Sequence, residues 1–212
     1  MRLVIGDVHG CADELAQLLD TVNADQVCLV GDCFTKGPDP VGVWSLIRDR
    51  GLMVTLGNHD DRLIQALDLK EASQELDALQ CVQRLEAADP AWSEAVRTWP
   101  LFHKMGDWTV VHAGLHPTAG VRLTDRRMAL TMRRWPLERS DFPLWHGQYT
   151  AEERVCFGHD ARRGLVRVER DGQPWLVGLD SGCVYGGALS GYLIDEDRIV
   201  QVKARRVHKP VD

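Results

Sequence analysis

Gly6-Asp7-Val8-His9-Gly10 closes the first apolar run of the chain, Leu3-Val4-Ile5, and the rest of the chain is organised around it. Its aspartate and histidine stand two residues apart, and in an extended segment such residues point to the same side. Both side chains can therefore reach one metal ion at the carboxyl end of a strand. Taken alone, an Asp-x-His pair is a weak signal, since most such pairs are a surface acid and a half-buried histidine.

The same pattern recurs at four later junctions, where an apolar run meets a glycine and a potential ligand. These are Val27–Val30 before Gly31-Asp32, Leu52–Leu56 before Gly57-Asn58-His59-Asp60, Thr109–Val111 before His112-Ala113-Gly114, and Arg154–Phe157 before Gly158-His159-Asp160. Glycine allows a positive φ or a close backbone approach, and ligands collect at the carboxyl ends of strands in open α/β sheets. One such junction is consistent with a plain strand-to-helix turn, but five of them favour a shared site.

Length and composition limit the class of protein. The chain has 212 residues, 44% of them hydrophobic and 26% charged, which predicts one soluble domain over residues 1–212 with or without a lid. The net charge of −6 argues against nonspecific binding to nucleic acid or to a membrane surface. It does not exclude a local basic pocket for an anionic substrate.

Cysteine usage and apolar runs predict a cytoplasmic protein. The six cysteines form no Cys-x-x-Cys motif, so we interpret them as buried small hydrophobes in a reducing compartment. No apolar run reaches the length of a membrane span. The N-terminus enters the first strand directly and leaves no room for a signal peptide.

Periodicity along the chain predicts alternating strands and helices. We expect helices over 12–22, over 40–50 with Asp39 as the N-cap, and after Asn58, and strands over 26–30, 52–56 and 108–112. The segment 122–149 reads as irregular and basic. Four strands, 163–169, 174–180, 189–195 and 198–203, are predicted to form a second, antiparallel sheet.

Residues 70–99 interrupt the alternation of predicted strands and helices and are rich in Glu, Gln and Ala. The Asp89-Pro90 step predicts two short helices on either side of it. They form either a lid within the domain or an ordinary helical layer, and the sequence favours neither.

The candidate ligands are oxygen and nitrogen donors without a thiolate. In chain order they are Asp7, His9, Asp32, Asn58, His112 and His159. This donor set suits manganese, iron, zinc or cobalt rather than a structural cysteine–zinc site. Six ligands are too many for one ion with an open position but suit two ions that share Asp32. Two ions about 3.5–4 Å apart can generate a hydroxide and bind both oxygens of an in-line displacement on phosphorus.

Taken together, the five motifs resemble the phosphoprotein-phosphatase branch of the calcineurin-like metallophosphoesterases, over residues 1 to about 195. Gly10-Cys11, Asp13-Glu14-Leu15, Lys36-Gly37-Pro38 and Leu179–Gly187 narrow the resemblance to the ApaH-like phosphatases and the symmetrical diadenosine tetraphosphate hydrolases. The resemblance implies an α/β fold, a four-layer α/β/β/α sandwich of two mixed sheets with flanking helices and a small helical insertion. It also implies two divalent metal ions, with Mn²⁺ favoured and Fe, Zn or Co as alternatives.

The resemblance also assigns roles to the ligands. Asp7 and His9 hold the first metal, Asp32 bridges, and Asn58, His112 and His159 hold the second. His59 is the general acid that protonates the leaving oxygen; the alternative is a structural histidine beside Asn58.

For the substrate, Lys36 stands where the family has a phosphate-binding arginine. A lysine there offers a point charge rather than a bidentate fork. Arg134, or alternatively Arg133, supplies a second phosphate contact, and Tyr185 lines the pocket or belongs to the core. Thr35 departs from the protein phosphatases, which have an acid there that orients the catalytic histidine.

The expected function is hydrolysis of phosphoanhydride bonds in dinucleoside polyphosphates, with diadenosine tetraphosphate cleaved symmetrically to ADP. The alternatives are a serine/threonine protein phosphatase or a polyphosphatase with the same site, or a non-catalytic binding module that uses the same fold. The partner is then a small nucleotide or polyphosphate, or alternatively a phosphoprotein.

Overall fold

The protein is built of two five-stranded sheets packed face to face, in a computed structural model that describes residues 1–69, 76–137, 139 and 141–210. The first sheet has the order β10 (Arg198–Lys203), β9 (Ala188–Leu193), β1 (Arg2–Ile5), β2 (Gln26–Leu29), β3 (Met53–Val54). The second has the order β4 (Phe102–Met105), β5 (Trp108–Val111), β6 (Arg154–Phe157), β8 (Gln173–Gly178), β7 (Val166–Arg170). Both sheets mix parallel and antiparallel pairs.

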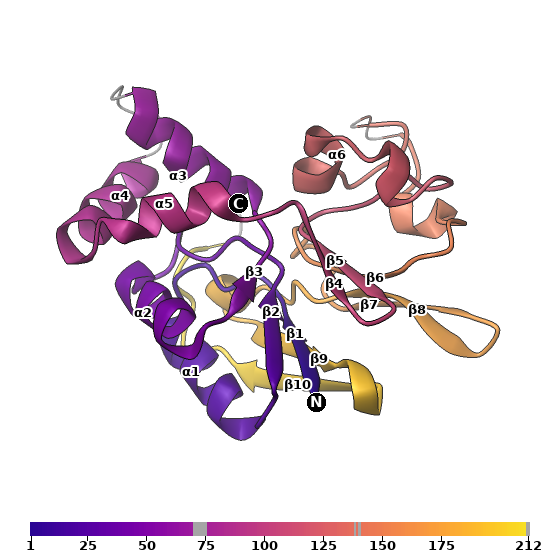
Figure 1. Cartoon of the computed structure of the whole chain (residues 1–212), viewed down its shortest axis with the longest axis horizontal. Coiled ribbons are helices and arrows are strands. Elements are labelled where there is room, and N and C mark those ends of the chain that lie inside the picture. The colour runs from indigo at the N-terminus through magenta and orange to yellow at the C-terminus, as the bar shows by residue number, and fades with distance from the viewer. Residues whose placement is uncertain (70–75, 138, 140, 211–212) are drawn as a thin grey trace.

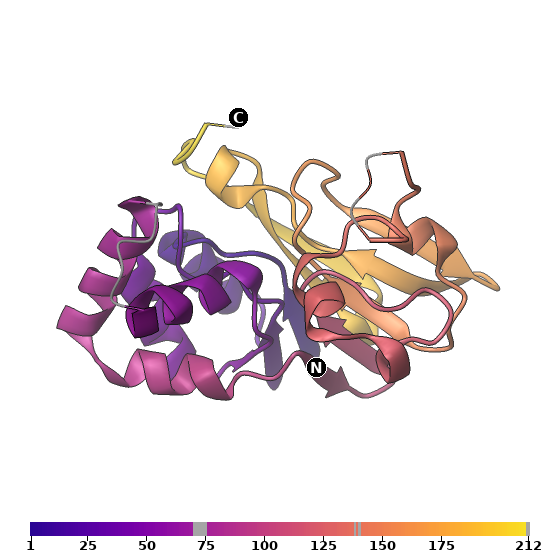
Figure 2. The same ribbon diagram turned by 90° about the horizontal axis from the view of Figure 1, so that it is seen from above.

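Helices and loops form the two outer layers. The helices over the first sheet are α1 (Ala12–Thr21), α2 (Pro40–Arg50), α3 (Asn58–Leu69), α4 (Leu76–Ala88) and α5 (Ala91–Thr98) (Figures 1 and 2). The chain between β5 and β6, which carries the short helix α6 (Arg126–Thr131), covers the other face of the second sheet. The predicted four-layer α/β/β/α architecture is confirmed.

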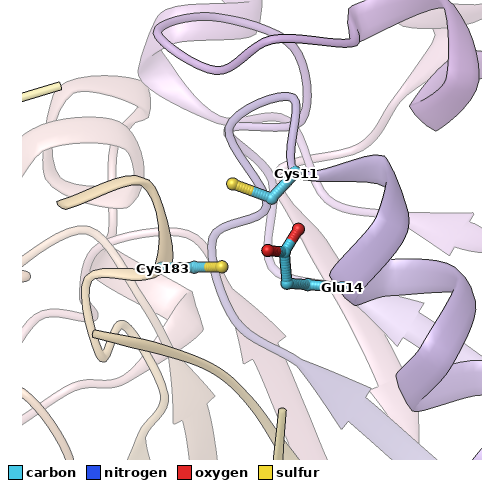
Figure 3. Close-up of side chains that lie close together, drawn as sticks. All are labelled: Cys11, Glu14 and Cys183. Atoms are coloured by element: carbon cyan, nitrogen blue, oxygen red, sulfur yellow. The ribbon is translucent and has the colours of Figure 1, made fainter. Parts of the chain in front are cut away.

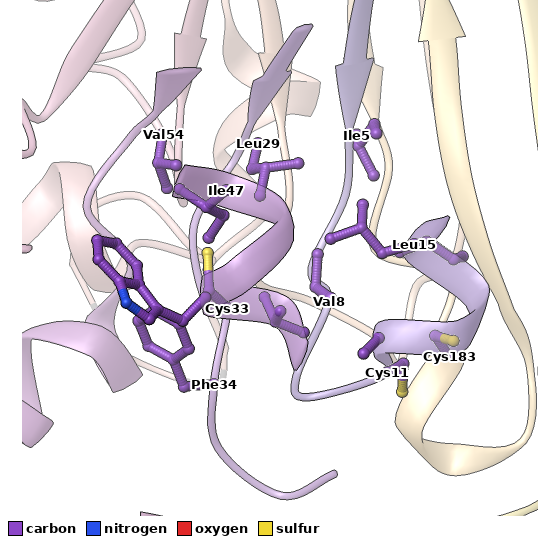
Figure 4. Close-up of a cluster of buried hydrophobic side chains, with 14 of the residues drawn as sticks. Ile5, Val8, Cys11, Leu15, Leu29, Cys33, Phe34, Ile47, Val54 and Cys183 are labelled. Atoms are coloured by element: carbon purple, nitrogen blue, oxygen red, sulfur yellow. The ribbon is translucent and has the colours of Figure 1, made fainter. Parts of the chain in front are cut away.

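Strand alternation explains why the layers stack. In β1, Leu3 and Ile5 enter the cluster beneath the helices, whereas Val4 enters the cluster between the two sheets. Figure 4 shows Ile5 from β1 beside Leu15 of α1 in that first cluster. In β5, Val110 faces the first sheet and Val111 faces the outer segment. Because successive strand side chains point to opposite faces, each strand can bury apolar groups in two spaces.

Local signals place α2 as the sequence predicts. Asp39 accepts a hydrogen bond from the backbone N–H of Gly42 at 3.0 Å, and Pro40 is the first helical residue. The helix ends at Gly51, whose φ of 61° lies in the left-handed region that glycine tolerates. The predicted helix over 40–50 is confirmed, and α1 agrees with its prediction within one residue.

The prediction that the last four strands form a separate antiparallel sheet is wrong. β9 and β10 extend the first sheet, where β9 lies antiparallel to β1. β7 and β8 belong to the second sheet, where β8 runs parallel to β6. Alternating side chains identify a strand but not the sheet that it joins, because pairing depends on partners distant in sequence.

The segment 70–99 lies partly outside the described residues, since 70–75 are not among them. Helices α4 and α5 pack on the first core through fully buried side chains such as Leu85 and Trp92. Whether they also move as a lid stays a prediction. Within the described ranges, no helix is both long and apolar enough to cross a bilayer.

Candidate metal centre

Five loops at the carboxyl ends of strands bring the predicted ligands together. They follow β1, β2, β3, β5 and β6, the junctions that the sequence singled out. All six side chains are buried: Asp7, His9, Asp32, Asn58, His112 and His159. Five of them fall into two groups, Asp7–His9–Asp32 and Asp32–His112–His159, with ligand atoms within 4.8 Å of one another in each. Asp32 belongs to both groups.

The two carboxylate oxygens of Asp32 face different neighbours. Oδ2 lies 3.6 Å from Nε2 of His9, and Oδ1 lies 3.6 Å from Nε2 of His112. Burial alone would raise the pKa of Asp32, but the neighbouring histidines, His112 foremost, outweigh it and hold that pKa well below its usual range. A carboxylate ionised in this position can bridge two cations.

The environment of His112 suits a cation. Its Nδ1 lies 3.0 Å from the carbonyl oxygen of Val30, and because a carbonyl only accepts, Nδ1 carries the proton and Nε2 a lone pair. Nε2 lies 2.9 Å from Oδ1 of Asn58 and 3.1 Å from Nδ1 of His159. Burial lowers the pKa of both histidines and favours their neutral, ligating forms. These electron-pair donors fit a divalent cation, with Val30 orienting the ring as is usual for metal-bound histidines.

The group Asp7–His9–Asp32 differs from the second group because it carries an excess of buried negative charge. Burial raises the pKa of Asp7 well above its usual range, and Asp180 and Asp32 add to the shift. The backbone N–H of His159 donates to both carboxylate oxygens of Asp7, at 3.1 and 3.2 Å. A cation between Asp7, His9 and Asp32 would compensate this charge. The residues present therefore fit two divalent ions.

Glycine precedes several ligands because the backbone there has no room for a side chain. A Cβ on Gly158 would stand 1.9 Å from Oδ1 of Asp7, and one on Gly57 would stand 2.4 Å from Oδ1 of Asp32. Positive φ also falls on three of the predicted ligands themselves, at 47° for His9, 52° for Asp32 and 73° for His159. Strained backbone of this kind clusters at functional sites.

The side chain of His59 lies beside the predicted ligands rather than among them. Its backbone N–H donates to Oδ1 of Asp32 at 2.9 Å, and its ring stands edge-on to that of His9 with centroids 5.2 Å apart. Burial lowers the pKa of His59 to about 4. Among the described residues, no side chain makes a hydrogen bond or ion pair to its ring. Thr35 contacts His9 instead, with Oγ1 3.4 Å from Nδ1.

A cavity of about 870 Å³ opens beside the two groups, with His9, Asp32, His59 and His159 in its wall. Its other lining residues include six with cationic side chains: Lys36, Arg133, Arg134, Arg162, Arg163 and Lys209. The lining also holds four carboxylates, those of Asp32, Asp77, Asp160 and Asp180, and the six cationic side chains outnumber them. Within a chain of net charge −6, this local excess favours an anionic ligand.

The predicted phosphate contacts all reach this cavity but differ in surroundings. Nζ of Lys36 lies 3.1 Å from Nε2 of His9 and 5.6 Å from the ring centroid of Tyr185. Arg133 donates to the carbonyl oxygen of His159 at 3.2 Å, which brings it close to the second ligand group. The guanidinium of Arg134 instead donates to the carbonyl of Phe142.

Sequence reasoning missed Asp180 as a site residue. It is buried in the wall of the cavity, its Oδ1 accepts from the backbone N–H of Gly182 at 3.1 Å, and burial raises its pKa to about 6. The signal was present, because Leu179-Asp180-Ser181-Gly182 follows β8 and repeats the pattern of a strand followed by a carboxylate.

Comparisons with known proteins agree with this geometry. The profile of the calcineurin-like phosphoesterases matches residues 2–172. A symmetrical bis(5'-nucleosyl)-tetraphosphatase of Nitrosomonas europaea is 27% identical over 95% of this chain and 98% of its own length. An asymmetrical bis(5'-nucleosyl)-tetraphosphatase of Halalkalibacterium halodurans is 25% identical over 96% and 94%. A crystal structure described as a candidate diadenosine tetraphosphatase is 30% identical, with a TM-score of 0.81 over 96% of this chain and 93% of that one.

Proposed function

The chain belongs to the calcineurin-like phosphoesterase family, and on that premise we propose that it hydrolyses phosphoanhydride bonds of dinucleoside polyphosphates, with diadenosine tetraphosphate cleaved to ADP. The observation that carries the proposal is the sharing of Asp32 between two ligand groups at the wall of a cationic cavity. The names of the relatives support the substrate class.

The proposed cofactor is a pair of divalent cations; the oxygen and nitrogen donors suit Mn²⁺, Fe, Zn or Co, and the family resemblance favours Mn²⁺. Asp7 and His9 would hold one ion, Asn58, His112 and His159 the other, and Asp32 both. When bound, such ions lower the pKa of water and neutralise charge on phosphoryl oxygens.

The chain's own residues would then bind and orient the phosphates. Lys36 meets the phosphoryl group as a point charge, and the position of Tyr185 beneath its ammonium limits where that charge can go. Arg133 is the better candidate for the second phosphate contact, because its bond to the carbonyl of His159 places its guanidinium beside the second ligand group, whereas Arg134 donates to the carbonyl of Phe142. His59 would give a proton to the leaving oxygen.

The surroundings of His59 favour anhydrides over esters. Expelling a serine alkoxide needs strong protonation, since an unassisted oxygen of this type has a pKa near ~16. A departing nucleotide phosphate is already a stable anion with a second pKa of about 6. Burial lowers the pKa of the His59 imidazole to about 4, and no carboxylate among the described residues accepts a hydrogen bond from its ring, so the surroundings do little to support the protonated form. His59 in these surroundings therefore suits a leaving group that needs little protonation, such as a nucleotide phosphate.

The decisive experiment is a substrate panel with added Mn²⁺ and products separated by chromatography. We expect kcat/KM for diadenosine tetraphosphate to exceed that for a phosphoserine peptide by at least about tenfold, which corresponds to ~1.4 kcal/mol of barrier. Inorganic polyphosphate completes the panel, and protein treated with chelator is the control. ADP as sole product supports symmetrical cleavage, whereas ATP with AMP indicates the asymmetrical reaction. Equal or faster turnover of the phosphopeptide would favour a protein phosphatase instead.

The proposed organisation is a single domain over residues 1–212, with α4 at the rim of the cavity. Asp77 in the first turn of α4 lines the cavity and pairs with Lys209 at 2.6 Å. In a lid formed by residues 70–99, this ion pair would join α4 to the C-terminal segment. A cytoplasmic location stays a prediction.

A further inference from the structure

A buried cluster outside the proposed dinuclear centre remains unexplained by the proposed reaction. It consists of Cys11 just before α1, Glu14 in the first turn of α1, and Cys183 in the loop between β8 and β9. Figure 3 shows the two thiols and the carboxylate pointing toward one another from these three places. Their sulfur and oxygen atoms lie within 4.8 Å of one another, and none of the residues is more than 2% exposed.

Helix capping does not account for this cluster. Cys11 occupies the N-cap position of α1, yet its side chain makes no capping hydrogen bond. Its thiol makes a long contact, 3.8 Å, with the carbonyl oxygen of His9, and its other partner is the Cys183 thiol. Thiols are weak donors and acceptors, so these two cysteines gain little from being placed beside a carboxylate.

The carboxylate of Glu14 lacks the partner that a buried charge requires. Among the described residues, its one hydrogen bond comes from the backbone N–H of Arg205 at 2.9 Å, and no side-chain cation forms an ion pair with it. The guanidinium of Arg205 pairs with Asp13 instead, at 2.6 Å. Buried carboxylates are normally paired with a cation or coordinate a metal.

Oxidation to a disulfide is the less suitable explanation of the paired thiols. Donation of a hydrogen bond by the Cys183 thiol to Cys11 raises the pKa of Cys183 above its usual range, and burial adds to that shift. Cysteines that sense oxidants are exposed and have low pKa values, because the thiolate is the reacting form. A bound metal ion, in contrast, deprotonates its thiol ligands itself.

We propose that Cys11, Glu14 and Cys183 form a third cation site, which takes a thiophilic divalent ion such as Zn²⁺ and is separate from the dinuclear centre. Two sulfurs about 2.3 Å from one ion stand roughly 3.8 Å apart in tetrahedral geometry, so only a small contraction of the cluster is needed. The ion displaces one proton from each thiol to the solvent, and its two positive charges neutralise the two thiolates. The carboxylate of Glu14 then gives the site one net negative charge. The sulfur ligands distinguish it from the oxygen and nitrogen donors of the dinuclear centre.

Such an ion would link the segment after β1 to the loop between β8 and β9, both of which contribute residues to the wall of the cavity. Cys11 lies two residues after His9, while Cys183 lies between Asp180 and Tyr185, which line the cavity. Binding should therefore stabilise the folded chain by mass action. We expect the thermal midpoint to rise further on the third equivalent of metal.

The test is a Co²⁺ titration of the full chain, stripped of metal and kept reduced without oxygen. Thiolate ligands give cobalt a charge-transfer band in the near ultraviolet, which the sulfur-free dinuclear centre cannot give. Wild-type protein should bind three equivalents and show this band. Cys11→Ser and Cys183→Ser should each bind two equivalents and lose most of it. Glu14→Gln can keep the bond from Arg205 and should weaken the third site at least tenfold.

The matched control is Cys28→Ala, which removes a buried thiol from β2 and should leave the band intact. Cobalt X-ray absorption of the wild type needs no variant and should detect two sulfur ligands on one of three ions. Uptake that stops at two equivalents, or a cobalt shell without sulfur, overturns the proposal. So does a band that survives both serine variants.

Discussion

Replacing His59 by asparagine tests the proposed chemistry most directly, because the exchange removes a proton donor without touching a ligand. The backbone N–H that bonds Asp32 remains, and asparagine is well tolerated at a helix start such as that of α3. We expect both ions of the proposed dinuclear centre to stay bound. Turnover should fall by about 10²–10⁴-fold, the usual contribution of general acid–base catalysis, or ~2.7–5.5 kcal/mol.

Where the loss falls in this range depends on the leaving group. Departure of ADP needs little protonation, so diadenosine tetraphosphate should lose about 10²-fold, while an alkyl phosphate ester should lose closer to ~10⁴-fold. The assay is kcat for both substrates, with metal content measured on the same samples. His103→Asn is the matched control, since His103 is a partly buried histidine on β4 that bonds Val54 and does not line the cavity. A collapse of metal content would make His59 a ligand, and an unchanged rate would refute its role as an acid.

Three further substitutions test the centre, the phosphate contact and the helical layer. Asp32→Asn should abolish turnover and weaken both ions, because Asp32 is shared by the two groups; full activity with less than one equivalent of metal would contradict this. Lys36→Ala should raise KM or lower kcat/KM severalfold and Lys36→Arg should restore part of it, whereas unchanged kinetics would place Lys36 outside the substrate path. Leu85→Ala should cost about 2–5 kcal/mol in urea unfolding if α4 is part of the core; a cost below ~1 kcal/mol would favour a detachable lid.

The grouping of the candidate side chains could be predicted because its signals are local. Each junction places a glycine and a polar residue directly after an apolar run, and the structure gathers those residues at one edge of the two sheets. The same reasoning could not place β9 and β10. Both can be recognised as strands, as β7 and β8 can, but the choice of sheet depends on the pairing of β9 with β1, almost the whole chain away.

Two short elements escaped prediction although their signals were present. Residues 126–131 form α6 inside a segment that we expected to be irregular, and Asp125 caps it by accepting from the N–H of Met128 at 2.8 Å. The second missed element is β4, which forms a hairpin with the predicted strand β5 through Gly106-Asp107, with Gly106 at a φ of 62°. A helix of six residues has too few turns to show a periodic stripe, and a four-residue strand offers little alternation.

The ligand loops also brace one another, which local sequence could not reveal. The N–H of His159 bonds the carboxylate of Asp7, and the N–H of His59 bonds that of Asp32. The N–H of His9 bonds the backbone carbonyl of Asp32 at 2.8 Å. Each loop thus orients a ligand or the backbone of another loop, and these bonds offset the strain of positive φ at His9, Asp32 and His159. These bonds hold the candidate ligands in place without a metal ion. A substitution in one loop should therefore weaken metal binding by residues that belong to another loop.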